Sequence, residues 1–97
     1  MLIKEIINLL KEDNNEIKIL DTNNKRTDKI SDIFIDENKN LIFYIGESTN
    51  NGYCVKELIK IIKEGDINYN NRMLVDCNEY VTIKKAYTNN KNIILEI

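Results

Sequence analysis

The sequence has no histidine, no proline and no tryptophan, and its 97 residues include only two cysteines and three glycines. Without histidine, acid–base chemistry near neutral pH would depend on Cys, Lys, Tyr or carboxylates. Cys54 and Cys77 are too few for a zinc site, and no histidine completes one. We therefore expect no metal, no cofactor and no catalytic residue, and we interpret the cysteines as small thiols in a reducing compartment.

The chain also lacks a strong excess of either charge. Lys and Arg sum to 14 against 16 for Asp and Glu, which gives a net charge of −2 and a pI near 5.2. This balance excludes a general attraction to DNA, RNA or anionic membranes. No apolar run approaches the roughly 20 residues that span a bilayer, and Lys4 and Glu5 interrupt the N-terminal pattern where a signal peptide would not be charged. We expect a cytoplasmic protein.

The remaining composition fits one folded domain over residues 1–97, because 42% hydrophobic residues suffice for a modest core. Apolar residues at helical spacing predict an amphipathic helix of about three turns in LIKEIINLLKED. Three β-rich segments follow, EIKIL, ISDIFID and LIFYI. We interpret DTNNKRTDK, between the first two, as a hairpin loop and DENKN as a turn.

The same order begins again after residue 53. VKELIKIIKEG predicts a helix that ends at Gly65, and MLVDC, EYVTIKKAYT and IILEI predict three strands. IKEIINLLKE matches VKELIKIIKE, KNLIFYI matches KNIILEI, and Asp21 matches Asp76. These matches predict internal repeats at about 1–45 and 54–97, joined by the loop 46–53.

The predicted fold class is α+β: a tandem duplication of an α-β-β-β unit, with two helices packed on antiparallel sheets around a pseudo-two-fold axis. A unit of about 45 residues is too small to bury enough apolar surface alone, so a second copy makes the domain viable. Either two three-stranded sheets or one six-stranded sheet satisfies the pattern. A homodimer would extend the same logic.

The order of IKEIINLLKE, EIKILD, ISDIFID, DENKN and LIFYI resembles that of short orphan proteins of phages and mobile elements. The resemblance concerns style and element order over most of the chain, and it transfers no functional residue. It implies a phage protein of the anti-defence type in the host cytoplasm. Such a protein either inhibits a CRISPR-type nuclease or sequesters an immune signalling nucleotide.

Acidic side chains form the first candidate surface, because carboxylates along a sheet edge can occupy a basic nuclease groove. The candidate partner-binding residues are Asp28, Asp32, Asp36, Glu37, Asp66 and Glu79. A merely solvated charged surface is the alternative interpretation.

A second set of residues suits a nucleotide. Arg26 and Arg72 are the only arginines, and their planar guanidinium groups can bind phosphates. The loop from Gly46 to Cys54 precedes a predicted helix N-terminus, where backbone N–H groups can bind an anion. Tyrosine rings can stack on a base. The candidate ligand-binding residues are Arg26, Ser48, Thr49, Tyr53, Tyr69, Arg72, Lys84 and Lys85. Surface salt bridges and helix capping by the loop account for the same residues without a ligand.

Three functions follow in order of preference. The first is a non-enzymatic inhibitor that binds a host defence protein. The second is a protein that sequesters a nucleotide in a pocket between repeats or protomers. The third is a structural or regulatory interaction module.

Overall fold

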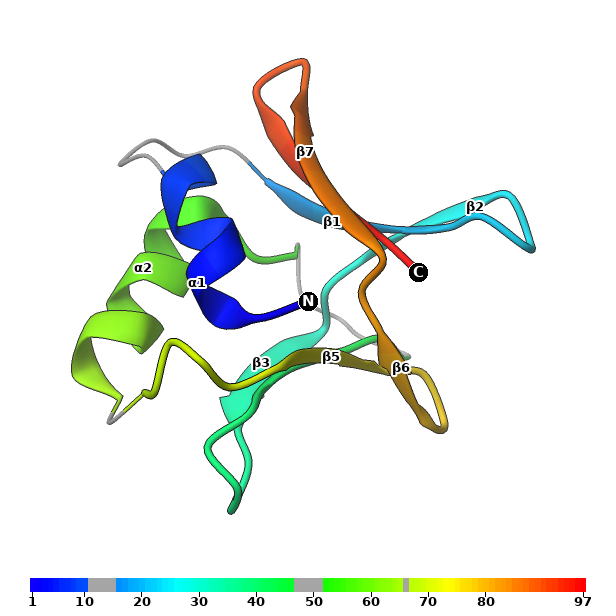
Figure 1. Ribbon diagram of the computed structural model, residues 1–97. Helices are drawn as coiled ribbons and strands as arrows, with labels where there is room; N and C mark the ends of the chain where they lie inside the picture. The colour runs from blue at the N-terminus through cyan, green and yellow to red at the C-terminus, as the bar shows by residue number, and fades with distance from the viewer. Residues whose placement is uncertain (11–15, 47–51, 66) are drawn as a thin grey trace.

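The computed structural model describes residues 1–10, 16–46, 52–65 and 67–97. Two four-stranded sheets and two short helices make up the described fold, which confirms the α+β class (Figure 1). The helical elements are α1 (Ile3–Ile6), the 3-10 turn η1 (Ile7–Leu9) and α2 (Val55–Glu64). The strands are β1 (Ile17–Asp21), β2 (Arg26–Lys29), β3 (Asp32–Ile35), β4 (Leu41–Tyr44), β5 (Met73–Asp76), β6 (Tyr80–Thr82), β7 (Lys85–Asn89) and β8 (Asn92–Glu96).

Both sheets are mixed, so the expectation of antiparallel sheets was wrong. The first sheet has the order β2-β1-β8-β7, and the second has the order β3-β4-β5-β6. In each, the central pair is parallel and both outer pairs are antiparallel. The pair β4 and β5 is joined through α2, which is the crossover connection that parallel strands require.

Each half of the chain contributes one hairpin to each sheet. The hairpins β1-β2 and β7-β8 form the first sheet, and β3-β4 and β5-β6 form the second. Two-residue corners, at Ile30–Ser31 and at Ile83–Lys84, carry the chain from one sheet to the other. Ile30 and Ile83 are each 1% exposed, so burial of an isoleucine holds both corners in the core.

The sequence predicted six strands, whereas the described residues form eight. The segment DTNNKRTDK, expected to be a loop, contains β2, whose polar residues are tolerated because it is an exposed edge strand. The segment EYVTIKKAYT, expected to be one strand, divides at Ile83 into β6 and β7.

The two helices have different outcomes. The α2 helix confirms the prediction, and it stops before Gly65, whose N–H donates to the carbonyl of Ile61. The expected three-turn first helix is shorter, with one α turn followed by one 3-10 turn, because Leu10 is already extended. Residues 11–13 of the predicted helix lie outside the described residues.

One hydrophobic core contains side chains from both halves. The inward residues of the four central strands are at most 1% exposed: Ile17, Ile19, Leu41, Phe43, Met73, Val75, Ile93 and Leu95. Each such side chain contributes roughly 1.5–3 kcal/mol through burial. Both helices lie on the same side of the sheets in Figure 1, where α1 adds Ile3 and Ile6 and α2 adds Leu58.

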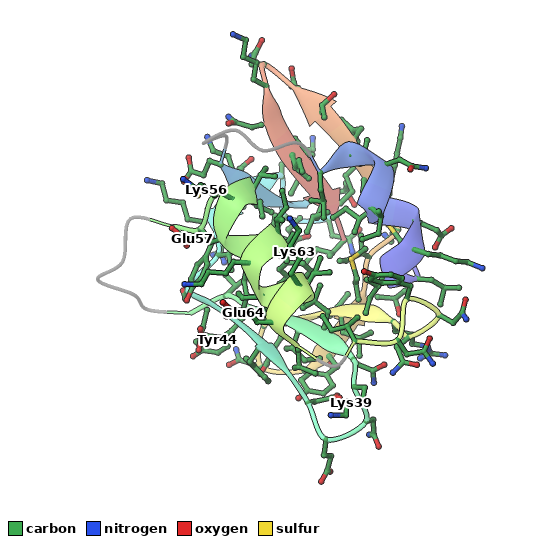
Figure 2. All side chains as sticks on the ribbon, turned by 90° about the vertical axis from the view of Figure 1, so that its left-hand side faces the viewer. Lys39, Tyr44, Lys56, Glu57, Lys63 and Glu64 are labelled. Atoms are coloured by element: carbon green, nitrogen blue, oxygen red, sulfur yellow. The ribbon has the colours of Figure 1, made fainter. Side chains whose placement is uncertain are left out.

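The opposite side of α2 is charged. Lys56, Glu57, Lys63 and Glu64 are exposed, and Figure 2 shows them along the side of the helix that faces away from the sheets. Within the described ranges, no helix has the length and apolar character that crossing a membrane requires.

Candidate functional sites

The outward side of the second sheet carries a cluster that we name the tyrosine face, made of Asp32, Phe34, Tyr44, Asp76 and Tyr80. Asp32, Tyr44, Asp76 and Tyr80 occupy one cross-strand row, and Phe34 heads the adjacent row, opposite Ile42. These residues point outward because their neighbours Ile33, Phe43 and Val75 point into the core.

The tyrosine face concentrates exposed aromatic surface. In the described part of the chain, the large hydrophobic side chains that remain exposed are Phe34 (36%), Tyr44 (38%), Tyr69 (50%) and Tyr80 (55%). Three of these four belong to the tyrosine face. Ile42 and Leu74 continue the row of Phe34 on the same face and are 0% and 8% exposed, so the aromatic side chains border a covered apolar strip.

Two carboxylates flank Tyr44 on this face. Asp32 Oδ1 accepts a hydrogen bond from the Tyr53 hydroxyl at 3.0 Å and another from the N–H of Ile33 at 2.9 Å, which fix its position. Burial and the contact with Asp32 raise the pKa of Tyr53, so this phenol stays protonated and keeps donating. Asp76 lies on the other side of Tyr44 in the row.

The outward side of the first sheet is different, and we name it the lysine face, made of Lys18, Lys29, Lys85, Tyr87 and Glu96. Glu16 lies 3.9 Å from the Lys18 ammonium and 3.7 Å from that of Lys29, and the Lys85 ammonium lies 5.3 Å from the Tyr87 ring centroid. A hydrogen bond with Glu96 raises the pKa of Tyr87. Most charges on this face therefore already have partners in the protein.

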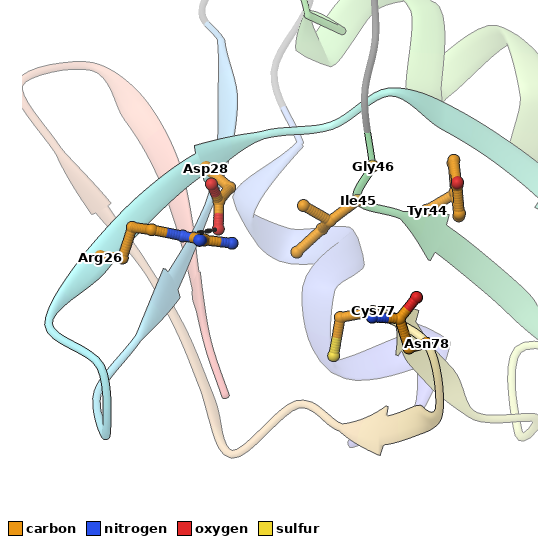
Figure 3. A pocket seen from close by; sticks show the side chains of 7 residues that line it. All are labelled: Arg26, Asp28, Tyr44, Ile45, Gly46, Cys77 and Asn78. Atoms are coloured by element: carbon orange, nitrogen blue, oxygen red, sulfur yellow. Dashed lines mark hydrogen bonds and ion pairs between the residues drawn. The ribbon is translucent and has the colours of Figure 1, made fainter.

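A hollow of about 650 Å³ opens between β2 of the first sheet and the ends of β4 and β5 of the second. It is lined by Arg26, Asp28, Tyr44, Ile45, Gly46, Cys77 and Asn78 (Figure 3). Arg26 Nε donates to Asp28 Oδ2 at 2.9 Å, and Figure 3 shows the rest of the guanidinium directed toward Ile45.

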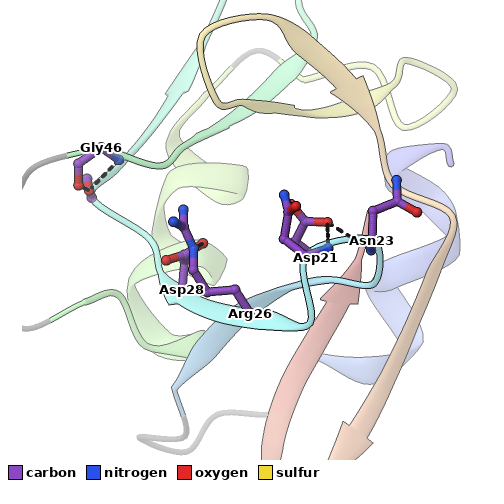
Figure 4. Close-up of polar contacts among 7 residues, drawn as sticks. Asp21, Asn23, Arg26, Asp28 and Gly46 are labelled. Carbon is purple, nitrogen blue, oxygen red and sulfur yellow. Dashed lines mark hydrogen bonds and ion pairs between the residues drawn. The ribbon is translucent and has the colours of Figure 1, made fainter.

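Side-chain hydrogen bonds fix the backbone near the hollow (Figure 4). The Ser31 hydroxyl donates to the Gly46 carbonyl at 2.9 Å and accepts from the Gly46 N–H at 3.1 Å, which joins the β2–β3 corner to the end of β4. Asp21 accepts from the N–H groups of Asn23 and Asn24 in the β1–β2 turn, and the contacts with Asn24 contribute most to lowering the pKa of Asp21.

Carboxylates dominate the charge near this hollow. Burial raises the pKa of the Cys77 thiol, a hydrogen bond with the Glu79 backbone partly offsets the rise, and the charges of Glu79, Asp21 and Asp76 add to it. Cys77 is therefore a thiol rather than a thiolate at neutral pH.

The acidic residues expected to bind a partner do not form one surface. Asp32 belongs to the tyrosine face, Asp28 is paired with Arg26, and Asp36 closes the β3–β4 turn by accepting from the N–H groups of Asn38 and Asn40. Glu37 lies in that turn and Glu79 precedes β6, whereas Asp66 lies outside the described residues.

The residues expected to bind a nucleotide are also dispersed. Arg26 lines the hollow, Tyr53 contacts Asp32, Lys85 belongs to the lysine face, Lys84 lies at the β6–β7 corner and Arg72 precedes β5. Tyr69 lines a separate groove of about 230 Å³ with Ile7, Leu10, Ile59, Ile62 and Lys63. Ser48 and Thr49 lie outside the described residues.

Phe34 and Tyr44 were not predicted to be site residues. A signal was present, because alternation along DIFI and LIFY places Phe34 and Tyr44 opposite the core-facing positions. Among the described residues, no group of three or more Cys, Asp or Glu side chains is arranged to hold a metal ion. Comparisons with models of protein families, with curated proteins and with solved structures found no match.

Proposed function

We propose that this protein is a non-enzymatic binding protein whose tyrosine face docks on a basic surface of a protein partner. The observation that supports the proposal is the gathering of Phe34, Tyr44 and Tyr80 around two carboxylates on one sheet face. Tyrosine rings bury much area at low entropic cost and are common interface hot spots. Asp32 and Asp76 select a partner that presents Lys or Arg, which also stack on tyrosine rings.

The partner class that fits this chemistry best is a nuclease with a basic nucleic-acid groove. The proposal therefore keeps the expectation of a phage-type inhibitor of a CRISPR-type nuclease, but moves the binding surface from acidic loops to the tyrosine face. Of the six acidic residues expected at the interface, Asp32 is retained and Asp76 is added. Ion pairs at the edge of such a contact weaken as salt rises.

The experiment is a DNA-cleavage assay with purified CRISPR-type nucleases, titrated with the wild-type protein and two matched variants. Tyr80→Ala removes a 55% exposed ring from the tyrosine face, and Tyr69→Ala removes a 50% exposed ring elsewhere. We expect Tyr80→Ala to raise the inhibitory concentration by about thirtyfold or more, because truncating a hot-spot residue costs about 2 kcal/mol or more. Tyr69→Ala should leave it unchanged.

Circular dichroism and thermal unfolding would verify that both variants fold. Equal potency of wild-type and Tyr80→Ala proteins, or equal losses in both variants, would refute the role of the tyrosine face. A complete lack of inhibition across the nuclease panel would refute the assignment of the partner class.

We also propose that the chain arose by tandem duplication of an α-β-β-β-β unit whose copies exchange hairpins. Hydrogen bonds between the halves support this, because they recur in corresponding pairs at similar distances. In the first pair, the N–H of Ile17 donates to the Tyr53 carbonyl and the N–H of Met73 donates to the Met1 carbonyl. In the second pair, Leu41 donates to Arg72 and Ile93 donates to Glu16. In the third pair, Ile45 donates to Asp76 and Ile97 donates to Leu20. These bonds make Asp76 correspond to Leu20 rather than to Asp21.

A further inference from the structure

The hollow beside Arg26 has the size of a small-molecule site and a mainly polar lining. Its volume of about 650 Å³ lies within the roughly 300–1,000 Å³ typical of ligand pockets. Its walls come from β2, from the end of β4 and from the β5–β6 turn, so both sheets contribute. They supply a guanidinium, a carboxylate, a phenol, an amide and an apolar surface at Ile45.

The ion pair between Arg26 and Asp28 leaves hydrogen-bonding capacity on both partners. Asp28 Oδ2 receives Arg26 Nε, which leaves the two terminal guanidinium nitrogens as donors and Oδ1 as an acceptor for a ligand. The Arg26 donor beside the Asp28 acceptor can bind a planar ligand whose edge presents an acceptor next to a donor. Nucleobases present such edges, in which a carbonyl or ring nitrogen lies next to an N–H group.

The surrounding charge disfavours an anionic ligand. Asp28 already compensates Arg26, and the carboxylates of Asp21, Asp76 and Glu79 all act on Cys77 in the wall. A phosphate placed here would meet one paired guanidinium and several like charges. A neutral planar group brings no charge and can use the pair without breaking it.

Tyr44 provides a stacking surface in the wall. Gly46 lets the backbone pass close to the phenol, because a Cβ at residue 46 would overlap the Tyr44 ring. The ring is 38% exposed, so part of it is accessible from the hollow. A base that stacks on one aromatic side chain gains a contact that tolerates any base identity.

We propose that the hollow binds the base of a nucleoside, with the base edge on Arg26 and Asp28 and the base plane against Tyr44. The proposal concerns the free protein. It shares Tyr44 with the tyrosine face but does not depend on docking through that face. It replaces the expected phosphate grip by Arg26 with base recognition.

The experiment is calorimetric titration of the wild-type protein with guanosine, adenosine, uridine and cytidine, and with inorganic phosphate and glycine as probes of a plain anion site and a zwitterion site. Arg26→Gln and Asp28→Asn test the edge contacts, and Arg72→Gln is the control because it changes the other arginine, which does not line the hollow. We expect at least one nucleoside to bind, Arg26→Gln and Asp28→Asn each to weaken it about tenfold or more, and Arg72→Gln to leave it unchanged.

Arg26 is on an exposed edge strand, so the Gln variant is expected to fold, and its unfolding transition verifies this. The proposal is overturned by a lack of heat with all four nucleosides, by phosphate or glycine binding as tightly as any nucleoside, or by Arg72→Gln weakening binding as much as Arg26→Gln. None of these results bears on inhibition of a nuclease through Tyr80, so the two proposals fail separately.

Discussion

Replacing Asn92 and Asn40 with alanine tests the corresponding hydrogen bonds between the two halves of the chain. Asn92 Oδ1 accepts from the N–H of Glu16 at 3.1 Å, immediately before β1. Asn40 Oδ1 accepts from the N–H of Arg72 at 3.2 Å, immediately before β5. Each asparagine thus holds the start of a central strand that belongs to the other half.

The expected magnitudes follow from the burial of the two bonds. The bond from Glu16 is partly buried, so Asn92→Ala leaves an N–H group shielded from water, and we expect a loss of about 1 kcal/mol in the free energy of unfolding. The bond from Arg72 is exposed and water can replace it, so Asn40→Ala should cost about 0.5 kcal/mol. The two bonds share no residue, and the double variant should therefore lose about 1.5 kcal/mol.

Urea denaturation followed by circular dichroism measures these losses. With a slope near 2 kcal/mol per molar urea, Asn92→Ala should lower the midpoint by about 0.5 M. Asn23→Ala is the matched control, because Asn23 lies exposed in the β1–β2 turn, where its backbone N–H rather than its side chain donates the hydrogen bond to Asp21. The reasoning fails if Asn92→Ala shifts the midpoint no more than Asn23→Ala does, or if the double variant shows strong coupling.

Two further predictions concern Gly52 and Cys77. Gly52 has a φ of 92°, and a Cβ there would also meet Glu16 Oε1 at 2.7 Å. Gly52→Ala should therefore lower the free energy of unfolding by about 1 kcal/mol or more through backbone strain and crowding. Gly52→Asn brings the same Cβ but should lose less, because Asn tolerates positive φ better; equal losses in urea denaturation would contradict this. Because the pKa of Cys77 is raised, its thiol should react with iodoacetamide at pH 7.5 more slowly than a free peptide thiol. Asp76→Asn should lower that pKa and speed the reaction. Mass spectrometry of the modified peptide measures both rates, and an unchanged rate in the variant would show that Asp76 does not contribute.

The sequence predicted those parts of the fold that depend on local periodicity. The helical spacing of Val55, Leu58 and Ile62 and the stop at Gly65 gave α2 correctly. The β2 strand was missed because Arg26 to Lys29 carry no hydrophobic residue, and an exposed edge strand needs none. Its pairing with β1 is a tertiary property that the local pattern does not contain.

The parallel pairing of the central strands was missed for another reason, although a signal existed. A strand, a helix and a strand in succession are typical of parallel strands joined by a crossover, and β4, α2 and β5 follow that order. The segment before α2 was interpreted as a boundary between repeats, so β4 and β5 were assigned to separate repeats and only antiparallel pairing was expected. The site inherited this error, because Tyr44 and Asp76 become neighbours only through the parallel register of β4 and β5.

The proposed duplication explains why function is expected on one sheet face and not on both. The corresponding hydrogen bonds place Tyr44 at the position of Glu96, Asp76 at that of Leu20, and Asp32 at that of Lys85.

The core positions are apolar in both halves because each sheet is built from both. The outward positions are under no such constraint, and there the two sheets differ in both charge and aromatic content. On the lysine face, Lys18 and Lys29 lie near Glu16 and Tyr87 contacts Glu96, whereas on the tyrosine face three aromatic rings remain exposed. A partner that binds the tyrosine face should therefore not bind the lysine face of the same molecule, and a 1:1 complex is the expected stoichiometry. Light scattering of the complex measures this ratio, and two partner molecules per chain would contradict the divergence of the two faces.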